Sequence, residues 1–298
     1  MTDVSTNLRQ KAWLGPVLLV VGGVGIGLAP IGLRLSEFGP QATALWRYIF
    51  ALPMLAAFAW SQGLKLGRPP PLALLAGVFF GIDIALWHAA LLETSVANAT
   101  FIVNLGAVGS GLAAWFILKE RPTKIWPIAA AIAIAGAAAL SFGAAGGGGG
   151  VRGDFLALFA AVFVAGYLIT ARLARRTANA ISVMFWATAA EIPVAAIAAT
   201  LTGEPLYSPQ LSWYVAPLFL ALFAHAIGQG CIVAGVGLTP AAISGVLMLI
   251  QPVTAGLIAW PLFGEALTPV QMAGAALVLF GVWLAGRPNP AKPIPPAP

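Results

Sequence analysis

The chain has 298 residues, of which 60% are hydrophobic and only 8% are charged. A soluble domain usually carries about 25% charged residues on its surface, so this composition excludes a soluble globular protein. The formal charge of +6 would suit nucleic acid or anionic lipid as a partner, and the positions of the fifteen basic residues decide between them.

Ten long apolar segments follow one another along almost the whole chain. Each has about 18–24 residues, enough for a helix to cross a hydrocarbon core of ~30 Å. The segments are 13–33, 42–60, 70–91, 96–118, 125–142, 154–173, 181–201, 213–236, 241–263 and 269–286. The sequence therefore predicts an all-α polytopic membrane protein with ten transmembrane helices and no soluble domain.

The basic residues favour one side of the predicted membrane. With the N-terminus in the cytoplasm, the outside loops hold only Arg34 and Arg152, and Arg47 lies inside a segment, so the other twelve are cytoplasmic. This is the positive-inside distribution. We therefore expect both termini in the cytoplasm, including the Pro-rich tail 288–298, and the lipid bilayer rather than nucleic acid as a partner.

Two nine-residue phrases, "WFILKERPT" at 115–123 and "WPLFGEALT" at 260–268, share Trp, Glu and Thr at the same positions. An overlay of 94–140 on 239–285 without gaps gives twelve identities. An offset of 140 residues also matches Trp46 with Trp186 and Pro53 with Pro193. These matches predict a duplicated chain.

The predicted repeats are 1–145 and 152–287, joined by a Gly-rich linker at 146–151 that we expect to be flexible. Each repeat contains five segments, an odd number, so the second must enter the membrane from the opposite side. We therefore predict two inverted five-helix repeats, an architecture shared by many secondary transporters with a site between the repeats.

Two five-segment repeats, each with Trp-x4-Glu-x2-Thr before a Gly-containing last segment, resemble the EamA type of the drug/metabolite transporter (DMT) superfamily. In length and aromatic content the chain is similar to the YddG-type aromatic amino-acid exporters. The resemblance covers nearly the whole chain. It implies export of amino acids or related metabolites across the bacterial inner membrane. One departure is Gly106-Ala107 in place of Gln251-Pro252, so we expect a kink only in the segment 241–263.

Polar side chains inside the apolar segments are functional candidates, because burying them in a membrane is costly. Asp83 and Trp87 share one helical face, and His225 and Gln229 share a face of the segment equivalent to it in the second repeat. We expect a central substrate cavity lined by Trp46, Asp83, Trp87, Asn104, Tyr167, Trp186, His225, Gln229, Ser244 and Gln251. We predict coupling or gating roles for Arg47, His88, Glu191 and Pro252.

Structural roles stay open for the same residues. Small and amide side chains at helical spacing also suit close helix packing and interhelical hydrogen bonds. Most aromatic residues are expected at lipid-facing or interfacial positions, and Arg47 can instead reach the headgroups. Glu120 and Glu265, at the ends of their segments, are expected to be solvated or to hold helices together.

The leading functional prediction is a secondary transporter of amino acids such as Phe, Trp, Tyr, Thr and Met, working by alternating access without a cofactor. Either facilitated diffusion or proton coupling through Asp83 and Glu191 is open, as is the oligomeric state, for which a monomer is plausible. The alternatives are an exporter of other drugs or metabolites, a membrane-embedded enzyme acting on a lipid-linked substrate, and an ion channel. The enzyme would need a metal cluster or catalytic dyad and the channel a filter loop, and neither pattern is present.

Overall fold

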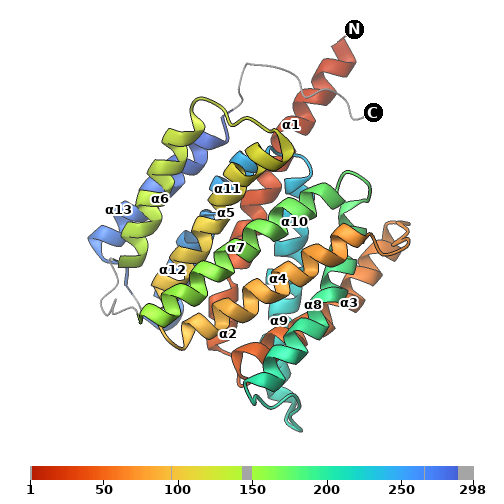
Figure 1. Cartoon of the computed structure of the whole chain (residues 1–298), viewed down its shortest axis with the longest axis vertical. Coiled ribbons are helices and arrows are strands. Elements are labelled where there is room, and N and C mark those ends of the chain that lie inside the picture. The colour runs from red at the N-terminus through yellow and green to blue at the C-terminus, as the bar shows by residue number, and fades with distance from the viewer. Residues whose placement is uncertain (1, 95, 143–149, 265, 288–298) are drawn as a thin grey trace.

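The computed structural model of the chain describes residues 2–94, 96–142, 150–264 and 266–287. All regular secondary structure in these ranges is helical, which confirms the predicted all-α class for the described residues (Figure 1). The elements are α1 (Thr2–Gly27), α2 (Ala29–Arg34), α3 (Pro40–Ser61), α4 (Pro71–Leu91), α5 (Val96–Leu118), α6 (Trp126–Phe142), α7 (Val151–Ala174), α8 (Ala180–Leu201), η1 (Leu211–Tyr214), α9 (Val215–Phe219), η2 (Leu220–Gln229), α10 (Gly230–Val236), α11 (Ala241–Leu247), α12 (Ile250–Phe263) and α13 (Pro269–Ala285).

Eight helical segments in the described ranges are long and apolar enough to cross a membrane. They are Trp13–Arg34, Pro40–Ser61, Pro71–Leu91, Ala99–Leu118, Val151–Ala174, Ala180–Leu201, Leu211–Val236 and Ala241–Phe263. The fifth and tenth predicted segments form the shorter apolar helices α6 and α13, of 17 residues each. A helix of that length covers about 25 Å, slightly less than a typical hydrocarbon core. The protein is thus a multi-pass membrane protein, and the count of ten spans stays a prediction.

Proline explains where the ninth segment breaks. Pro252 has no N–H to donate to the carbonyl of Met248, four residues earlier, and the chain passes from α11 to α12 at Met248 and Leu249. The Gln251 amide donates to the Met248 carbonyl instead, at 3.2 Å. The equivalent helix α5, which has Gly106 and Ala107 at these positions, is continuous. The predicted kink in the second repeat only is therefore confirmed.

The eighth segment is less regular than the sequence predicts. It begins with the 3-10 helix η1 and the short helix α9, continues as the π-helix η2 and ends as α10. A π-helix of ten residues is unusual, because this geometry mostly appears as a single turn inside an α-helix, often at functional sites. His225 and Gln229 both belong to η2.

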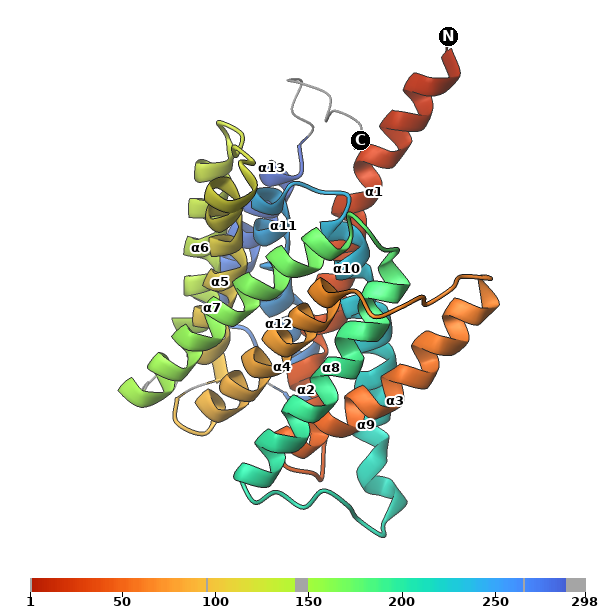
Figure 2. The same cartoon turned by 45° about the vertical axis from the view of Figure 1, so that its right-hand side comes forward.

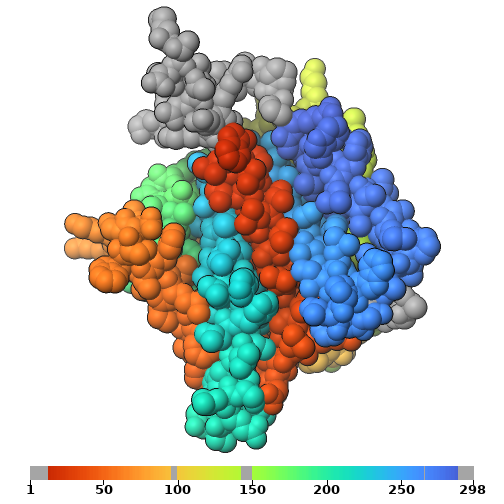
Figure 3. Space-filling view, turned by 180° about the vertical axis from the view of Figure 1, so that it is seen from behind, coloured from red at the N-terminus to blue at the C-terminus, as the bar shows by residue number. Residues whose placement is uncertain are grey.

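Contacts between helices pair up when the two halves of the chain are exchanged (Figures 1 and 2). Helix α4 packs on α7, and their equivalents η2 and α10 pack on α1. Helix α5 also packs on α7, as α12 packs on α1, and α4 packs on α8, as η2 packs on α3. Three further contacts map onto themselves: α3 with α8, α5 with α11, and α6 with α13. Figure 3 shows the face on which α1 lies between η2 and α12.

The α6–α13 contact repeats this relation at the level of single residues. A Cβ atom added to Gly136 would lie 2.6 Å from the carbonyl oxygen of Gly274. A Cβ atom added to Gly281 would lie 2.9 Å from the carbonyl oxygen of Ala129. The second pair of positions is the first pair related by the 145-residue offset, with the partners exchanged. Glycine is required in both places because the facing backbones approach so closely.

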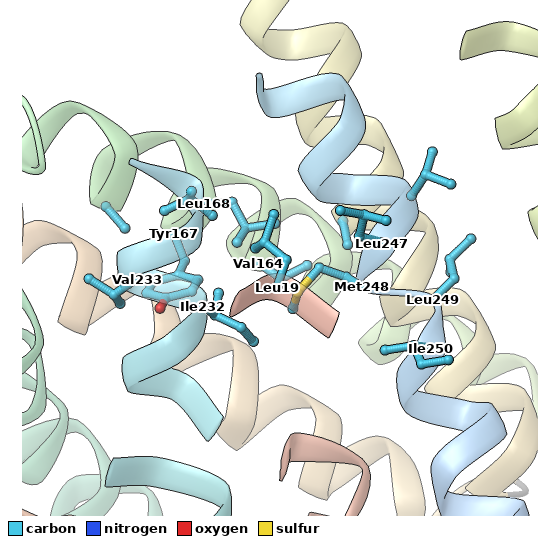
Figure 4. Close-up of a cluster of buried hydrophobic side chains, with 14 of the residues drawn as sticks. Leu19, Val164, Tyr167, Leu168, Ile232, Val233, Leu247, Met248, Leu249 and Ile250 are labelled. Atoms are coloured by element: carbon cyan, nitrogen blue, oxygen red, sulfur yellow. The ribbon is translucent and has the colours of Figure 1, made fainter. Parts of the chain in front are cut away.

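Apolar side chains from both halves fill the centre of the molecule. Figure 4 shows Leu19 of α1 with Val164 and Leu168 of α7, near Ile232 of α10 and Leu247 of α11. All five are buried. This packing fixes the helices that surround the polar cavity described next.

Candidate functional site

A cavity of about 860 Å³ lies between the two halves of the chain. Its wall is built by the junction of α1 and α2, by α3, α4 and α5 of the first half, and by α7, η2 and the α11–α12 break of the second. On α4 the lining residues Phe80, Asp83, Ile84 and Trp87 follow the i, i+3, i+4, i+7 spacing of one helical face. The cavity therefore uses one face of each surrounding helix.

Most of the predicted site residues line this cavity. From the predicted substrate set, the structure brings together Asp83, Trp87, Asn104, Tyr167, His225, Gln229 and Gln251. From the predicted coupling set it adds Arg47 and Pro252. Their arrangement around one space is observed, and their part in binding a substrate stays a prediction.

Trp46 and Trp186 are not among the lining residues, and the prediction that they face the cavity is wrong. The Trp46 indole N–H donates to the carbonyl oxygen of Leu206 at 2.8 Å. The Trp186 indole N–H donates to the carbonyl oxygen of Leu66 at 3.2 Å. Both pairs differ by the same offset of 140 residues with the halves exchanged, so the matched tryptophans fasten each half to a connection in the other. Trp46 also packs against Tyr214, with ring centroids 4.7 Å apart.

Three other predicted residues lie outside the main cavity. The Ser244 hydroxyl donates to the carbonyl of Pro240 in its own helix, at 3.1 Å, so its prediction as a lining residue is also wrong. His88 lines a second, smaller cavity of about 210 Å³, shared with Arg47. Glu191 is 1% exposed and lies next to His225 rather than on the wall itself.

The charged side chains of the cavity lack protein partners. Arg47 donates from Nη2 to the Tyr48 hydroxyl at 2.7 Å, but its Nε has no acceptor within the described ranges. Asp83 is 3% exposed, and its Oδ1 accepts no hydrogen bond from any described residue. No ion pair joins Asp83 to Arg47 among residues 2–94, 96–142, 150–264 and 266–287. Buried charge without a partner is costly, so both groups are suited to meet the charges of a bound molecule.

Aromatic and aliphatic side chains make up most of the remaining wall. The rings of Phe80 and Tyr167 have centroids 4.9 Å apart, and Trp87 lies one helical turn beyond Asp83. Ile84 and Val103 add aliphatic surface. An apolar space with a few convergent polar groups is typical of small-molecule sites.

The cavity lies towards one side of the molecule. Its wall includes Ala29 and Pro30 at the α1–α2 junction, Arg47 near the start of α3 and Thr100 near the start of α5. These positions adjoin the connections that the charge distribution predicts to be external. The space is therefore nearer to the predicted external side.

The opposite side is closed by a set of residues around Glu120, which we call the Glu120 cluster: Glu120, Arg172, Ala241, Val236 and Thr239. Arg172 donates to Glu120 Oε1 from Nε at 2.9 Å and from Nη2 at 2.8 Å, and also to the carbonyls of Val236 and Thr239. Glu120 Oε2 accepts from the Ala241 amide at 3.2 Å. The alternative that Glu120 holds helices together is confirmed, while Glu265 lies outside the described residues.

Sequence reasoning missed two parts of the site. Phe80 could have been found, because it lies three residues before Asp83 on the same helical face. The hydroxyl of Thr188, 2.8 Å from Nε2 of His225, had no such signal, because the two residues lie on different helices. The search for metal ligands finds no group of three or more His, Cys, Asp or Glu side chains suited to a metal in the described part of the chain.

Comparison with known proteins agrees with this architecture. The model of the EamA-like transporter family matches the chain twice, at residues 13–142 and 151–287. Uncharacterized transporter YwfM of Bacillus subtilis (strain 168) is 29% identical over 219 residues, which cover 71% of this chain and 72% of that protein. An "Uncharacterized transporter" of Archaeoglobus fulgidus is 26% identical over 261 residues, covering 85% of this chain and 78% of that one.

A solved crystal structure with 20% sequence identity has the same fold, with a TM-score of 0.75 over 93% of this chain and 96% of the other. The two family matches together span nearly all of the apolar segments. Because they cover both halves of the chain, it belongs to the EamA-like transporter family and is a multi-pass membrane transporter, not an enzyme.

Proposed function

We propose that this transporter carries small zwitterionic metabolites with an apolar body, and that aromatic and hydrophobic amino acids are its preferred substrates. The observation that carries the proposal is the pair of unpartnered charges, Arg47 and Asp83, on the wall of one largely apolar cavity. We infer export across the bacterial inner membrane, with both termini in the cytoplasm.

The charges suit the two ends of an amino acid. A guanidinium recognises a carboxylate well, because its planar N–H groups match the two oxygens. The Asp83 carboxylate suits an ammonium group. Asn104, Gln229 and Gln251 supply amide groups on the same wall for the remaining hydrogen bonds. A molecule with a single charge would leave either Arg47 or Asp83 without a partner.

The apolar wall suits the side chain of the substrate. Phe80, Trp87 and Tyr167 offer ring surfaces, and stacking on an aromatic ring contributes roughly 0.5–1.5 kcal/mol beyond simple burial. The volume of about 860 Å³ falls in the range typical of small-molecule sites. Sugars would place hydroxyl groups against this apolar wall, which favours amino acids over them.

We infer that the carrier works by alternating access of two inverted five-helix repeats, including α6 and α13 as membrane spans. Support comes from the helix contacts that map onto each other when the halves are exchanged, and from the two separate matches of the family model. Two similar halves of opposite orientation make the inward-open and outward-open states close in energy. The closed side at Glu120 and the cavity on the other side then describe one of these states.

Transport by the purified protein tests the substrate class. Liposomes that contain only the full-length protein should take up labelled phenylalanine in a saturable way. Unlabelled tryptophan, tyrosine, threonine and methionine should compete with it, and glucose should not. Saturable uptake of a sugar or nucleotide, with none for any amino acid in the panel, would contradict the proposal.

A further inference from the structure

Glu191 is a carboxylate in the membrane interior that the cavity does not reach directly. Its side chain on α8 is 1% exposed. Neither of its oxygens has a hydrogen-bond partner in the part of the chain that the structure describes. An unpaired carboxylate in such a place is strongly unfavourable unless it meets a positive group or takes up a proton.

His225 lies between Glu191 and the cavity. Its Nε2 is 3.4 Å from Oε2 of Glu191 and 2.8 Å from the hydroxyl oxygen of Thr188. The ring itself lines the cavity, whereas Glu191 does not. The only contact of this kind to Glu191 in the described ranges thus comes from a residue that touches the cavity.

The hydrogen bonds fix where the imidazole carries its hydrogen. The Thr188 hydroxyl donates its single hydrogen to the carbonyl oxygen of Met184, at 2.8 Å. It therefore accepts a hydrogen from Nε2 of His225. The same N–H faces Oε2 of Glu191, so a proton can pass between the two side chains without a change in the backbone.

Other charged and titratable groups surround the pair. From α3, Arg47 and Tyr48 lie within electrostatic range of Glu191, and from α7 Tyr167 does too. On α4, Asp83 lies within range of Arg47 and Tyr48.

His88, also on α4, lies within electrostatic range of Arg47. Cys231 of α10 is the thiol on another helix that packs against α8. Among the groups named here, Arg47 is the one that carries a permanent positive charge.

These groups hold one permanent positive charge and two carboxylates, Asp83 and Glu191. Arg47 balances one of them, so electrical neutrality in the membrane interior requires one additional positive charge. We propose that Glu191 and His225 together bind one exchangeable proton, and that its movement to and from the cavity through His225 couples transport to a proton gradient. The proposal rests on the chain being a carrier and does not depend on which substrate it carries.

The step moves a proton and breaks no other bond. A proton taken up at Nδ1 of His225 allows the Nε2 proton to move to Oε2 of Glu191, which becomes a neutral carboxylic acid. The Thr188 hydroxyl can then turn and donate to Nε2, so the imidazole stays neutral. Release follows the same route in reverse. The π-helical geometry of η2, which holds His225, fits a functional position of this kind.

A flux experiment tests the coupling. Full-length protein in liposomes is assayed with labelled phenylalanine, with and without a pH gradient across the membrane. The wild type should respond to the gradient, and Glu191→Gln should lose the response while keeping exchange at equal pH on both sides. Glu93→Gln is the matched control, because Glu93 is exposed and paired with Arg152 at 3.3 Å. A gradient response of Glu191→Gln equal to that of the wild type would overturn the proposal.

Infrared titration of the substrate-free protein in lipid tests proton binding by itself. The wild type should show a protonated carboxyl group near neutral pH. This signal should persist in Asp83→Asn and Glu93→Gln and disappear in Glu191→Gln. A wild-type protein with no such signal, or a signal that only Asp83→Asn removes, would overturn the proposal.

If Glu191→Gln does not fold, His225→Gln takes its place, since its amide can still donate to Thr188. This variant should keep the carboxyl signal but lose the gradient response. A full response in His225→Gln would overturn the relay. Failure of phenylalanine transport together with a normal infrared titration would count against the proposed substrate and support the proton site.

Discussion

The charges of the Glu120 cluster and the charges around the cavity are arranged in opposite ways. In the Glu120 cluster, Arg172 donates to a carboxylate and to two carbonyls, and Glu120 also accepts from a backbone amide. Around the cavity, Arg47 Nε, Asp83 Oδ1 and both oxygens of Glu191 find no hydrogen-bond partner among the described residues. Charges that the protein satisfies itself hold helices together, and charges that it leaves unsatisfied are available to a ligand or a proton.

The largest expected effect follows from removing the cavity cation. Arg47→Gln should weaken phenylalanine transport by about 2–5 kcal/mol, roughly 30-fold or more, because the substrate carboxylate and Asp83 both lose their positive partner. The measurement is saturable uptake per folded molecule in liposomes. Arg68→Gln, at an exposed position between α3 and α4, is the control. Unchanged uptake in Arg47→Gln would show that this charge is structural, like those of the Glu120 cluster.

A smaller effect of another kind is expected at the Glu120 cluster. Glu120→Gln should destabilise the closed side by about 1–3 kcal/mol, because Arg172 loses its charged acceptor while the Ala241 amide keeps one. A cysteine at Ser110, which is 1% exposed, reports the opening. After replacement of Cys231 by serine, impermeant thiol reagents applied from the predicted cytoplasmic side should label it faster in Glu120→Gln. Equal labelling rates would mean that the cluster does not control access on this side.

The α6–α13 contact should affect stability and leave substrate selection alone. Gly136→Ala places a Cβ atom 2.6 Å from a backbone oxygen, and we expect a cost of about 1–3 kcal/mol. Gly109→Ala is the matched control, because nothing lies within 4 Å of an added Cβ there. Thermal unfolding in lipid measures the difference, and competition among amino acids should be the same in both variants. A change in selectivity would place this helix pair in the transport path.

The matched tryptophans give the smallest expected effect. Trp46→Phe and Trp186→Phe should each cost about 0.5–1.5 kcal/mol of stability, the contribution of one hydrogen bond, because each loses its bond to a carbonyl in the other half. Uptake of phenylalanine per folded molecule should not change. A selective loss of aromatic substrates in either variant would return that tryptophan to the binding site.

Local rules predicted much of the fold. Apolar runs marked the helices, and Pro252 marked the break in the ninth segment, because both effects depend on neighbouring residues. Helical spacing likewise placed Asp83 with Trp87, and His225 with Gln229, on the cavity wall.

What the sequence did not predict depends on distant partners. Trp46 and Trp186 matched each other because both bind carbonyls in the opposite half, which resembles a shared site when only the sequence is known. The ion pair of Glu120 with Arg172 joins residues 52 positions apart. The π-helix η2 has no local pattern that distinguishes it from an apolar α-helix.

Competition by phenylalanine analogues tests most directly whether the unpartnered cavity charges bind both ends of a zwitterion. Uptake of labelled phenylalanine into liposomes is measured against phenethylamine, which lacks the carboxylate, and 3-phenylpropionate, which lacks the ammonium group. Phenylalanine itself should compete strongly and both analogues weakly, because each leaves Arg47 or Asp83 without a partner. Competition by either analogue as strong as that by phenylalanine would contradict the account.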